Sequence, residues 1–161
     1  MDIQLILGPN NSGKSLFAEN LCVKEKEAPL FYLATMVSQN EENEQRIEKH
    51  RLQRAGKGFT TIEEPWDIHT LALPQDAVVL LEDASNLLAN GIFIHHSNVN
   101  EAFERILTLA NKCQKLVIVN ISGLAEGDYD EETNSYIRQM NLLNQLLEEA
   151  SASCFRFELQ E

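Results

Sequence analysis

The stretch that most constrains the fold of this chain is a loop near its N-terminus, Gly8-Pro9-Asn10-Asn11-Ser12-Gly13-Lys14-Ser15, which fits the pattern G-x-x-x-x-G-K-[ST] in full. An apolar run precedes it at residues 3–7, and residues 16–21 follow with helical spacing. A loop between a strand and a helix can direct backbone N–H groups at a polyphosphate, and the helix adds its positive N-terminal end. A chance Gly/Ser/Asn turn is the weaker interpretation, because strand, loop and helix occur in the right order. The sequence therefore predicts a nucleotide phosphate site of the P-loop type.

Two side chains of this loop and one later acid carry the expected phosphate chemistry. Lys14 is predicted to reach the β- and γ-phosphates, and the Ser15 hydroxyl to ligate Mg²⁺. Glu82 follows the continuous apolar run 78–81, which is typical of a buried parallel strand, and is the candidate acid for Mg²⁺ or its bound water. Asp83 beside it has the weaker claim, since acids there also cap strands. Ser85 is expected either to add a hydroxyl near the phosphates or to cap the following helix.

Strand and helix patterns alternate along the chain. Strands are expected at 3–7, 30–34, 59–62, 78–81, 115–120 and 154–158, and helices at 16–21, 41–54, 98–111 and 131–150. Long connections between strands indicate right-handed βαβ units. The expected fold is α/β, a P-loop NTPase with a mostly parallel sheet and helices on both faces. The length of 161 residues predicts one nucleotide-binding domain, 1–161.

Net charge and composition limit the kinds of partner that the chain is expected to bind. A net charge of −12 argues against a nucleic-acid or anionic-membrane surface, but not against a nucleotide, which N–H groups and Mg²⁺ bind locally. No apolar run approaches a membrane span, and the N-terminus enters a strand at once, so a cytoplasmic protein is expected. Cys22, Cys113 and Cys154 are odd in number and widely spaced, which favours buried free thiols over metal or redox roles.

His50 is the less usual feature, because it lies in the charged helical segment 41–54. Within it, a stripe of four residues recurs every four positions: Glu42, Arg46, His50 and Arg54. A neutral imidazole nitrogen can attack phosphorus, and the arginines would help to hold phosphate charge. On pattern alone, a solvated helix with an incidental histidine is favoured. The pair His95-His96 has no other ligand candidates nearby and is predicted to lie in a surface loop.

Further short motifs follow the phosphate loop along the chain. They are Tyr32-x-Ala34-Thr35, Glu42-x-x-x-Arg46-Ile47-x-x-His50-x-x-x-Arg54, Glu63-Glu64-Pro65, Leu80-Leu81-Glu82 with Ser85 and Asn90, Asn120, and Asn144-Gln145. Ala18 and Glu19 match the continuation G-K-S-x-x-A-E of the loop. On these residues the chain resembles the bifunctional adenosylcobinamide kinases/adenosylcobinamide-phosphate guanylyltransferases of cobalamin biosynthesis. The resemblance covers nearly the whole chain and is strongest through Asn90.

The resemblance implies a RecA-like sheet and two reaction steps. In the first, the aminopropanol hydroxyl of the corrinoid adenosylcobinamide is phosphorylated from GTP or ATP with Mg²⁺. In the second, GMP passes from GTP to a histidine, which His50 matches by position, and then to the phosphorylated corrinoid. Arg46 and Arg54 would lie near the phosphates, and Thr35 and Glu63 are assigned to nucleotide binding. The resemblance also implies a homo-oligomer, with the His-bearing helix near a subunit boundary.

The second half of the chain departs from the family pattern. The family continues N-E-V-G-x-G-I-V-P after the asparagine, whereas this chain reads Asn120-Ile121-Ser122-Gly123-Leu124-Ala125-Glu126-Gly127-Asp128. Its F-R-D-x-x-G segment is replaced by residues 136–141, with Ile137 and Arg138 at the Arg and Asp positions. Three hypotheses follow: a divergent enzyme with one or both activities, a non-catalytic nucleotide-binding paralogue with a regulatory or assembly role, and a P-loop kinase for another small metabolite.

Overall fold

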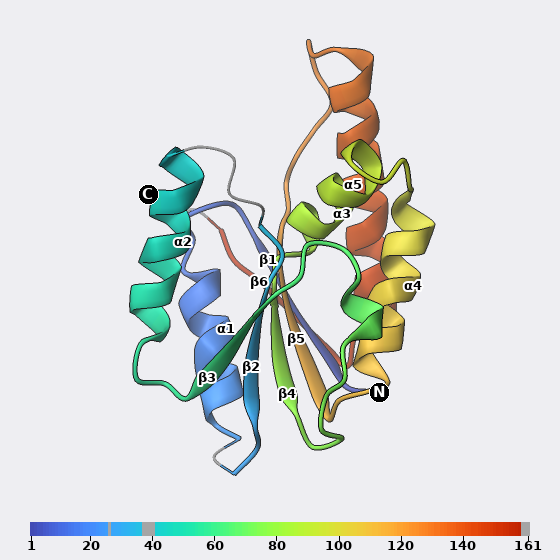
Figure 1. Cartoon of the computed structure of the whole chain (residues 1–161). Coiled ribbons are helices and arrows are strands. Elements are labelled where there is room, and N and C mark those ends of the chain that lie inside the picture. Colours follow the sequence, from blue (N-terminus) through green and yellow to red (C-terminus); the bar gives the residue numbers. More distant parts are fainter. Residues whose placement is uncertain (26, 37–40, 159–161) are drawn as a thin grey trace.

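The computed structural model describes residues 1–25, 27–36 and 41–158, without the side chains of residues 42 and 43. Its centre is a six-stranded sheet in the order β3-β2-β4-β5-β1-β6 (Figure 1). The strands are β1 (Ile3–Gly8), β2 (Leu30–Ala34), β3 (Phe59–Glu63), β4 (Val78–Glu82), β5 (Lys115–Ile121) and β6 (Ser153–Arg156). All five strand pairs are parallel, which confirms the predicted α/β fold and makes the sheet fully parallel.

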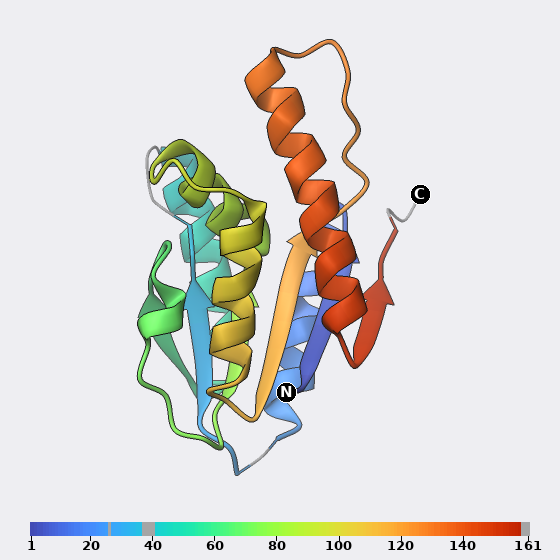
Figure 2. The same cartoon turned by 90° about the vertical axis from the view of Figure 1, so that its right-hand side faces the viewer.

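Helices cover both faces of this sheet, as predicted. The helices are α1 (Lys14–Val23), α2 (Glu41–Arg54), α3 (Ala84–Phe93), α4 (Val99–Ala110) and α5 (Glu131–Ala150), with a short 3₁₀ helix at Ile68–Thr70. Helices α3, α4 and α5 lie on one face, and α1 lies on the other with α2 beside it (Figures 1 and 2).

The two covered faces explain why the central strands β4, β5 and β1 are mostly apolar, whereas the edge strands β3 and β6 carry polar residues. In β1, Ile3, Leu5 and Leu7 pack toward α3, α4 and α5, whereas Ile6 packs toward α1. Successive side chains of a strand point to opposite faces, so a strand covered on both sides has no exposed positions to fill with polar residues.

The caps of three helices are defined by side chains. The Asp83 carboxylate accepts from the backbone N–H of Asn86 and so begins α3, and Asn98 and Asp130 do the same for α4 and α5. The alternative that Ser85 caps this helix is wrong, because Ser85 lies within α3 and its hydroxyl donates to Asp83 at 2.7 Å.

The cysteines are free thiols, as expected, although Cys154 is only half-buried. Burial raises the pKa of Cys22 to about 12 and that of Cys113 to about 11. Of the helices in the described ranges, none has the length and apolar character that crossing a bilayer requires.

Candidate nucleotide-binding cleft

A cleft of about 980 Å³ opens where β1, β2, β3 and β4 end, between the loop before α1 and helix α2. The carboxyl ends of parallel strands are the usual place for ligands in such sheets. The predicted site residues that line the cleft are Asn10, Asn11, Ser12, Gly13, Lys14, Ser15, Arg46, His50, Arg54, Glu63 and Glu82. Residues more than 70 positions apart in the sequence therefore share one surface.

Gly8 and Pro9 shape the loop from behind and do not line the cleft. A Cβ atom at Gly8 would lie 2.9 Å from both Phe157 Cβ and Ser12 Oγ, so only glycine fits between the loop and the segment after β6. The Pro9 carbonyl accepts hydrogen bonds from Ser12 Oγ at 2.8 Å and from Lys14 Nζ at 2.9 Å. The loop is thus closed by its own side chains.

Lys14 carries its charge in a poorly solvated position. It is 8% exposed, and burial is the main cause that lowers its pKa below 10.5. Nearby Asp83 and Glu82 oppose this shift, and Arg46 adds to it. An ammonium with few water neighbours binds an incoming phosphate without losing much hydration.

Three predicted residues meet at the centre of the cleft. Ser15 Oγ donates to Glu82 Oε1 at 2.8 Å, and His50 Nδ1 lies 3.4 Å from Ser15 Oγ and 3.5 Å from Glu82 Oε1. Burial raises the pKa of Glu82, while His50 and Ser15 act in the opposite direction. His50 of α2 is therefore in contact with the P-loop of the same chain.

The oxygen atoms at this point suit a hard cation. Glu82 Oε2 is buried and makes no hydrogen bond of good geometry within the described residues. A carboxylate with an unused oxygen beside a serine hydroxyl is the kind of ligand set that Mg²⁺ accepts, with waters and phosphate oxygens completing the shell. Ser15 and Glu82 thus fit the predicted metal.

Helix α2 supplies most of the positive charge of the cleft. The Arg54 guanidinium lies 3.3 Å from the centre of the Tyr32 ring, and its Nη2 donates to Thr61 Oγ1 at 3.4 Å. The lysines and arginines that line the cleft are Lys14, Arg46, Lys49, Arg51 and Arg54. A chain with a net charge of −12 thus concentrates cations where phosphates are expected.

Thr35 lies outside the cleft, and Glu63 stands exposed at its rim. Thr35 is fully buried: its N–H donates to the Glu82 carbonyl at 3.3 Å and its hydroxyl to the Asp83 carbonyl at 2.8 Å. This geometry does not favour direct contact between the Thr35 side chain and a nucleotide. Instead, Thr35 fixes the backbone that carries the two acids.

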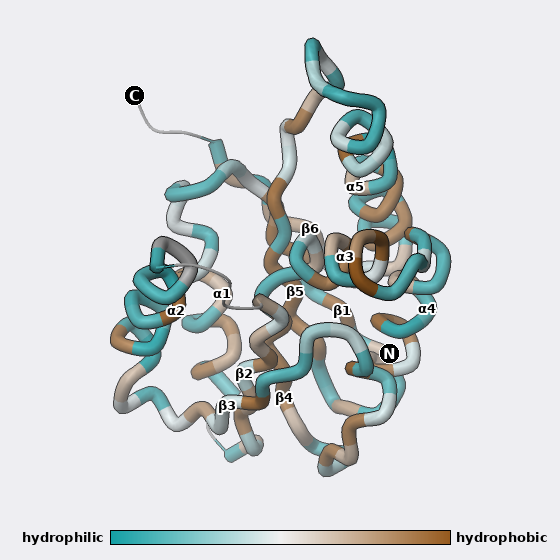
Figure 3. The backbone as a smooth tube through the Cα atoms, turned by 45° about the horizontal axis from the view of Figure 1, so that its top comes forward, coloured by the Kyte–Doolittle hydropathy of each residue, from teal (hydrophilic) through white to brown (hydrophobic). Residues whose placement is uncertain are grey.

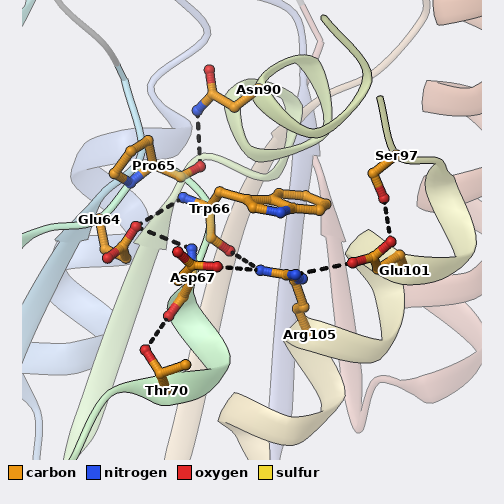
Figure 4. A network of polar contacts seen from close by, with 9 residues as sticks. All are labelled: Glu64, Pro65, Trp66, Asp67, Thr70, Asn90, Ser97, Glu101 and Arg105. Carbon is orange, nitrogen blue, oxygen red and sulfur yellow. Dashed lines mark hydrogen bonds and ion pairs between the residues drawn. The ribbon is translucent and has the colours of Figure 1, made fainter. Parts of the chain in front are cut away.

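Asn90 joins Thr35 to a second polar network. Its amide donates to the Thr35 and Pro65 carbonyls, both at 2.9 Å. Figure 4 shows Arg105 reaching from α4 to the Trp66 carbonyl at 3.1 Å and to Asp67 at 2.7 Å. The loop after β3 is therefore fastened to both α3 and α4.

Sequence reasoning missed three residues beside the cleft. Glu19 of α1 contacts Gln53 and Lys57, and Gln53 also lies against Ser15. Only Glu19 had a signal in the sequence, as part of the motif that continues the loop. Gln53 and Lys57 look like any other polar residues of a charged segment.

The divergent second half lies away from the cleft. Asn120 of β5 donates to Asn144 Oδ1 of α5 at 2.6 Å in a buried pair, and Arg138 is exposed and paired with Glu126 and Glu131. Within the described residues, none after Val119 lines the cleft. His95 and His96 are exposed in a loop, as predicted.

Comparisons with known proteins identify the family of the chain and proteins of similar fold. The family model for cobinamide kinase / cobinamide phosphate guanyltransferase (CobU) matches residues 4–157. A similar solved structure is the flagellar accessory protein FlaH from Methanocaldococcus jannaschii, with 16% identity and a TM-score of 0.56, covering 99% of this chain and 72% of that chain. That likeness concerns the RecA-like P-loop fold. The search of curated proteins gave no significant match.

Proposed function

Because the chain belongs to the cobinamide kinase/cobinamide phosphate guanyltransferase (CobU) family, we propose that it performs a corrinoid phosphorylation, a GMP transfer, or both. The kinase step would move the γ-phosphoryl group of GTP or ATP to the aminopropanol hydroxyl of adenosylcobinamide. The transferase step would move GMP from GTP, through His50, to the resulting phosphate. The observation that carries the proposal is the position of His50 Nδ1, 3.4 Å from Ser15 Oγ of the P-loop.

In both steps the loop would hold the nucleotide by its phosphates. Lys14 and the backbone N–H groups would contact the β- and γ-phosphates, with Arg46 and Arg54 on the α2 side. Ser15 and Glu82 would hold Mg²⁺, which neutralises charge that develops on the phosphate oxygens. Glu63 at the rim would contact the nucleotide away from its phosphates, and Thr35 would act through the backbone of Glu82 and Asp83.

The transferase step would use the far nitrogen of the His50 ring. Since Nδ1 faces the Glu82 carboxylate at 3.5 Å, Nε2 is left to attack the α-phosphorus. A P–N bond would form as the bond to the β-phosphate breaks and pyrophosphate leaves. The corrinoid phosphate would then displace His50 from phosphorus. The proposal includes association into a homo-oligomer, with the helix that bears His50 near a subunit boundary.

The test is covalent labelling. Incubation with α-labelled GTP and Mg²⁺ is expected to leave an acid-labile label on the wild type and none on His50→Ala. His96→Ala is the matched control, because His96 is exposed in a distant loop, and it should label as the wild type does. Equal labelling of wild type and His50→Ala would exclude His50 as the nucleophile.

One observation favours a second candidate, a non-catalytic nucleotide-binding protein with a regulatory or assembly role. The positions where the family has Arg and Asp hold Ile137, which is buried, and Arg138, which pairs with acids at the surface. Under this hypothesis GTP or ATP binding is lost in Lys14→Ala, and neither cobinamide nor any other small alcohol is turned over. Phosphorylation of a non-corrinoid alcohol would instead indicate a different metabolite kinase.

A further inference from the structure

Helix α2 carries His50 but has almost no apolar side chains with which to pack. Ile47 is half-buried and Leu52 is 68% exposed, and the remaining residues of the helix are polar or charged. Figure 3 shows α2 as mostly hydrophilic where it stands beside α1. A helix without an apolar stripe gains little from burial against the sheet, so polar contacts must define its position.

Glu19 of α1 provides such contacts from a buried position. It lies four residues after Ser15, so both side chains share one face of α1. Its side chain is 0% exposed; Oε1 pairs with Lys57 Nζ at 3.3 Å, and Oε2 accepts from the Gln53 amide. A buried carboxylate persists in a fold only when it is paired and hydrogen-bonded. One partner of Glu19, Gln53, lies in the last turn of α2, and the other, Lys57, lies in the turn that follows the helix.

The turn after α2 directs Lys57 back toward α1. Gly56 and Gly58 on either side have φ angles of +78° and +87°, which glycine adopts without strain. The Lys57 N–H also donates to the Arg54 carbonyl at 3.1 Å, which ties the turn to the last residues of the helix. Arg54 itself rests on Tyr32, so the C-terminal end of α2 is held at two points.

Gln53 follows His50 by three residues, so the two side chains lie on the same side of α2. The Gln53 amide also lies 3.5 Å from Ser15 Oγ. We propose that Glu19 is a positioning residue: by holding Gln53 and Lys57 it fixes the end of α2 and sets the distance of His50 from Ser15. Its effect on catalysis rests on the proposed function, whereas the anchoring of α2 does not.

The first measurement is the rate of single-turnover labelling with α-labelled GTP. Glu19→Gln keeps the size of the side chain but removes its charge, and Lys57→Met removes the partner at a half-buried position. Each is expected to slow labelling by about 100-fold, as a displaced reacting group does. The affinity for a non-transferable GTP analogue is expected to stay within about threefold. The double variant should be no slower than the slower single variant.

The matched control is Glu25→Gln, because the Glu25–Lys115 ion pair of 2.8 Å ties the end of α1 to the sheet without touching α2. It should change neither labelling nor affinity. If Glu19→Gln lowers labelling and GTP affinity by the same factor, Glu19 supports the loop rather than α2, and the proposal is wrong.

The second measurement is amide hydrogen exchange, which needs no activity. Peptides from α2 are expected to exchange about tenfold faster in Glu19→Gln and Lys57→Met, with α4 and β5 unchanged. If the wild type takes no label but α2 exchanges faster in these variants, the proposal that Glu19 holds α2 is supported and the proposed transferase function is wrong. If the exchange of α2 is unchanged in both variants, Glu19 does not hold α2, and the proposal is wrong regardless of the labelling result.

Discussion

At the scale of single residues, Glu82 sits where an ionised group is unfavourable for folding. Burial is the largest cause that raises its pKa above 4.5. A carboxyl group with a raised pKa holds its proton more tightly in the folded than in the unfolded state. It therefore contributes stability below pH 4.5, and this contribution is lost as the pH rises through the folded-state pKa. The cost at neutral pH fits a residue retained for its chemistry.

Glu82→Gln should therefore raise the melting temperature in metal-free buffer at pH 8, because the amide carries no charge. The advantage should shrink as the pH falls and vanish below 4.5, where the wild-type carboxyl group is protonated in both states. Thermal unfolding over a series of pH values measures this. Glu63→Gln, at an exposed acid, should lack the effect. A Glu82→Gln protein less stable than wild type at pH 8 would contradict the assignment.

Gly8→Ala tests the close approach between the loop and the segment after β6. The added methyl group would lie 2.9 Å from Phe157 Cβ and Ser12 Oγ, so the backbone must shift. We expect the free energy of unfolding to fall by about 1–3 kcal/mol, as for overpacked cores, with weaker GTP binding. Gly127→Ala is the control, since its methyl group would meet only the Tyr129 ring, at 3.4 Å. Equal denaturant midpoints for the two variants would refute the argument.

At the scale of elements, the predicted bounds of α2 and α5 agree with the structure. Both segments are long and contain no glycine or proline, so their helical pattern is unambiguous. The sequence pattern does not predict where helix α3 begins and ends. Asn86, Asn90 and Gly91 weaken its helical pattern, and its packing depends on residues distant in the sequence. The 3₁₀ turn at Ile68–Thr70 is not predictable from the sequence for a different reason: residues 66–73 form a short segment of mixed pattern. The contact of His50 with Ser15 depends on how α2 rests on α1, which no pattern within either helix encodes.

Asn90→Ala tests how α3 holds two other elements. The substitution leaves the buried Thr35 carbonyl and the Pro65 carbonyl without the donor that each has at 2.9 Å. Loss of a partner for buried groups typically costs about 1–3 kcal/mol, which urea unfolding measures. Asn111→Ala, at the exposed end of α4, should cost much less. A similar loss in both variants would show that the Asn90 bridge adds no stability.

At the scale of the whole molecule, charge is distributed unevenly. The chain has 13 lysines and arginines, and among the described residues five of them line the cleft, four of these from α2. The net charge and the arginine stripe can be predicted from the sequence, but the proximity of Lys14 to the cations of α2 depends on the fold. Such an arrangement favours anions locally, although the molecule as a whole repels them.

Arg46→Gln should weaken GTP binding by about two- to fivefold at low salt, since Arg46 is exposed and acts mainly through its charge. The difference should disappear near ~1 M KCl, where charges are screened within a few ångströms. Calorimetric titration at several salt concentrations measures it. Arg138→Gln, whose side chain is also exposed but lies outside the cleft, should bind as wild type does. An Arg46 effect that persists at high salt would indicate a direct hydrogen bond instead.

The place of β1 in the sheet has a consequence for protein synthesis. Although β1 is made before the other five described strands of the sheet, its neighbours are β5 and β6, the last two of them. The apolar strand that ends in the phosphate loop must therefore wait, unpaired, until residues 115–121 emerge and insert between it and β4. Non-local pairing of this kind is slow, and until it is complete the unpaired strand edges are prone to aggregation. The loop that bears Lys14 and Ser15 is thus translated before the strands that flank β1, and β1 is among the last strands to be paired on both sides.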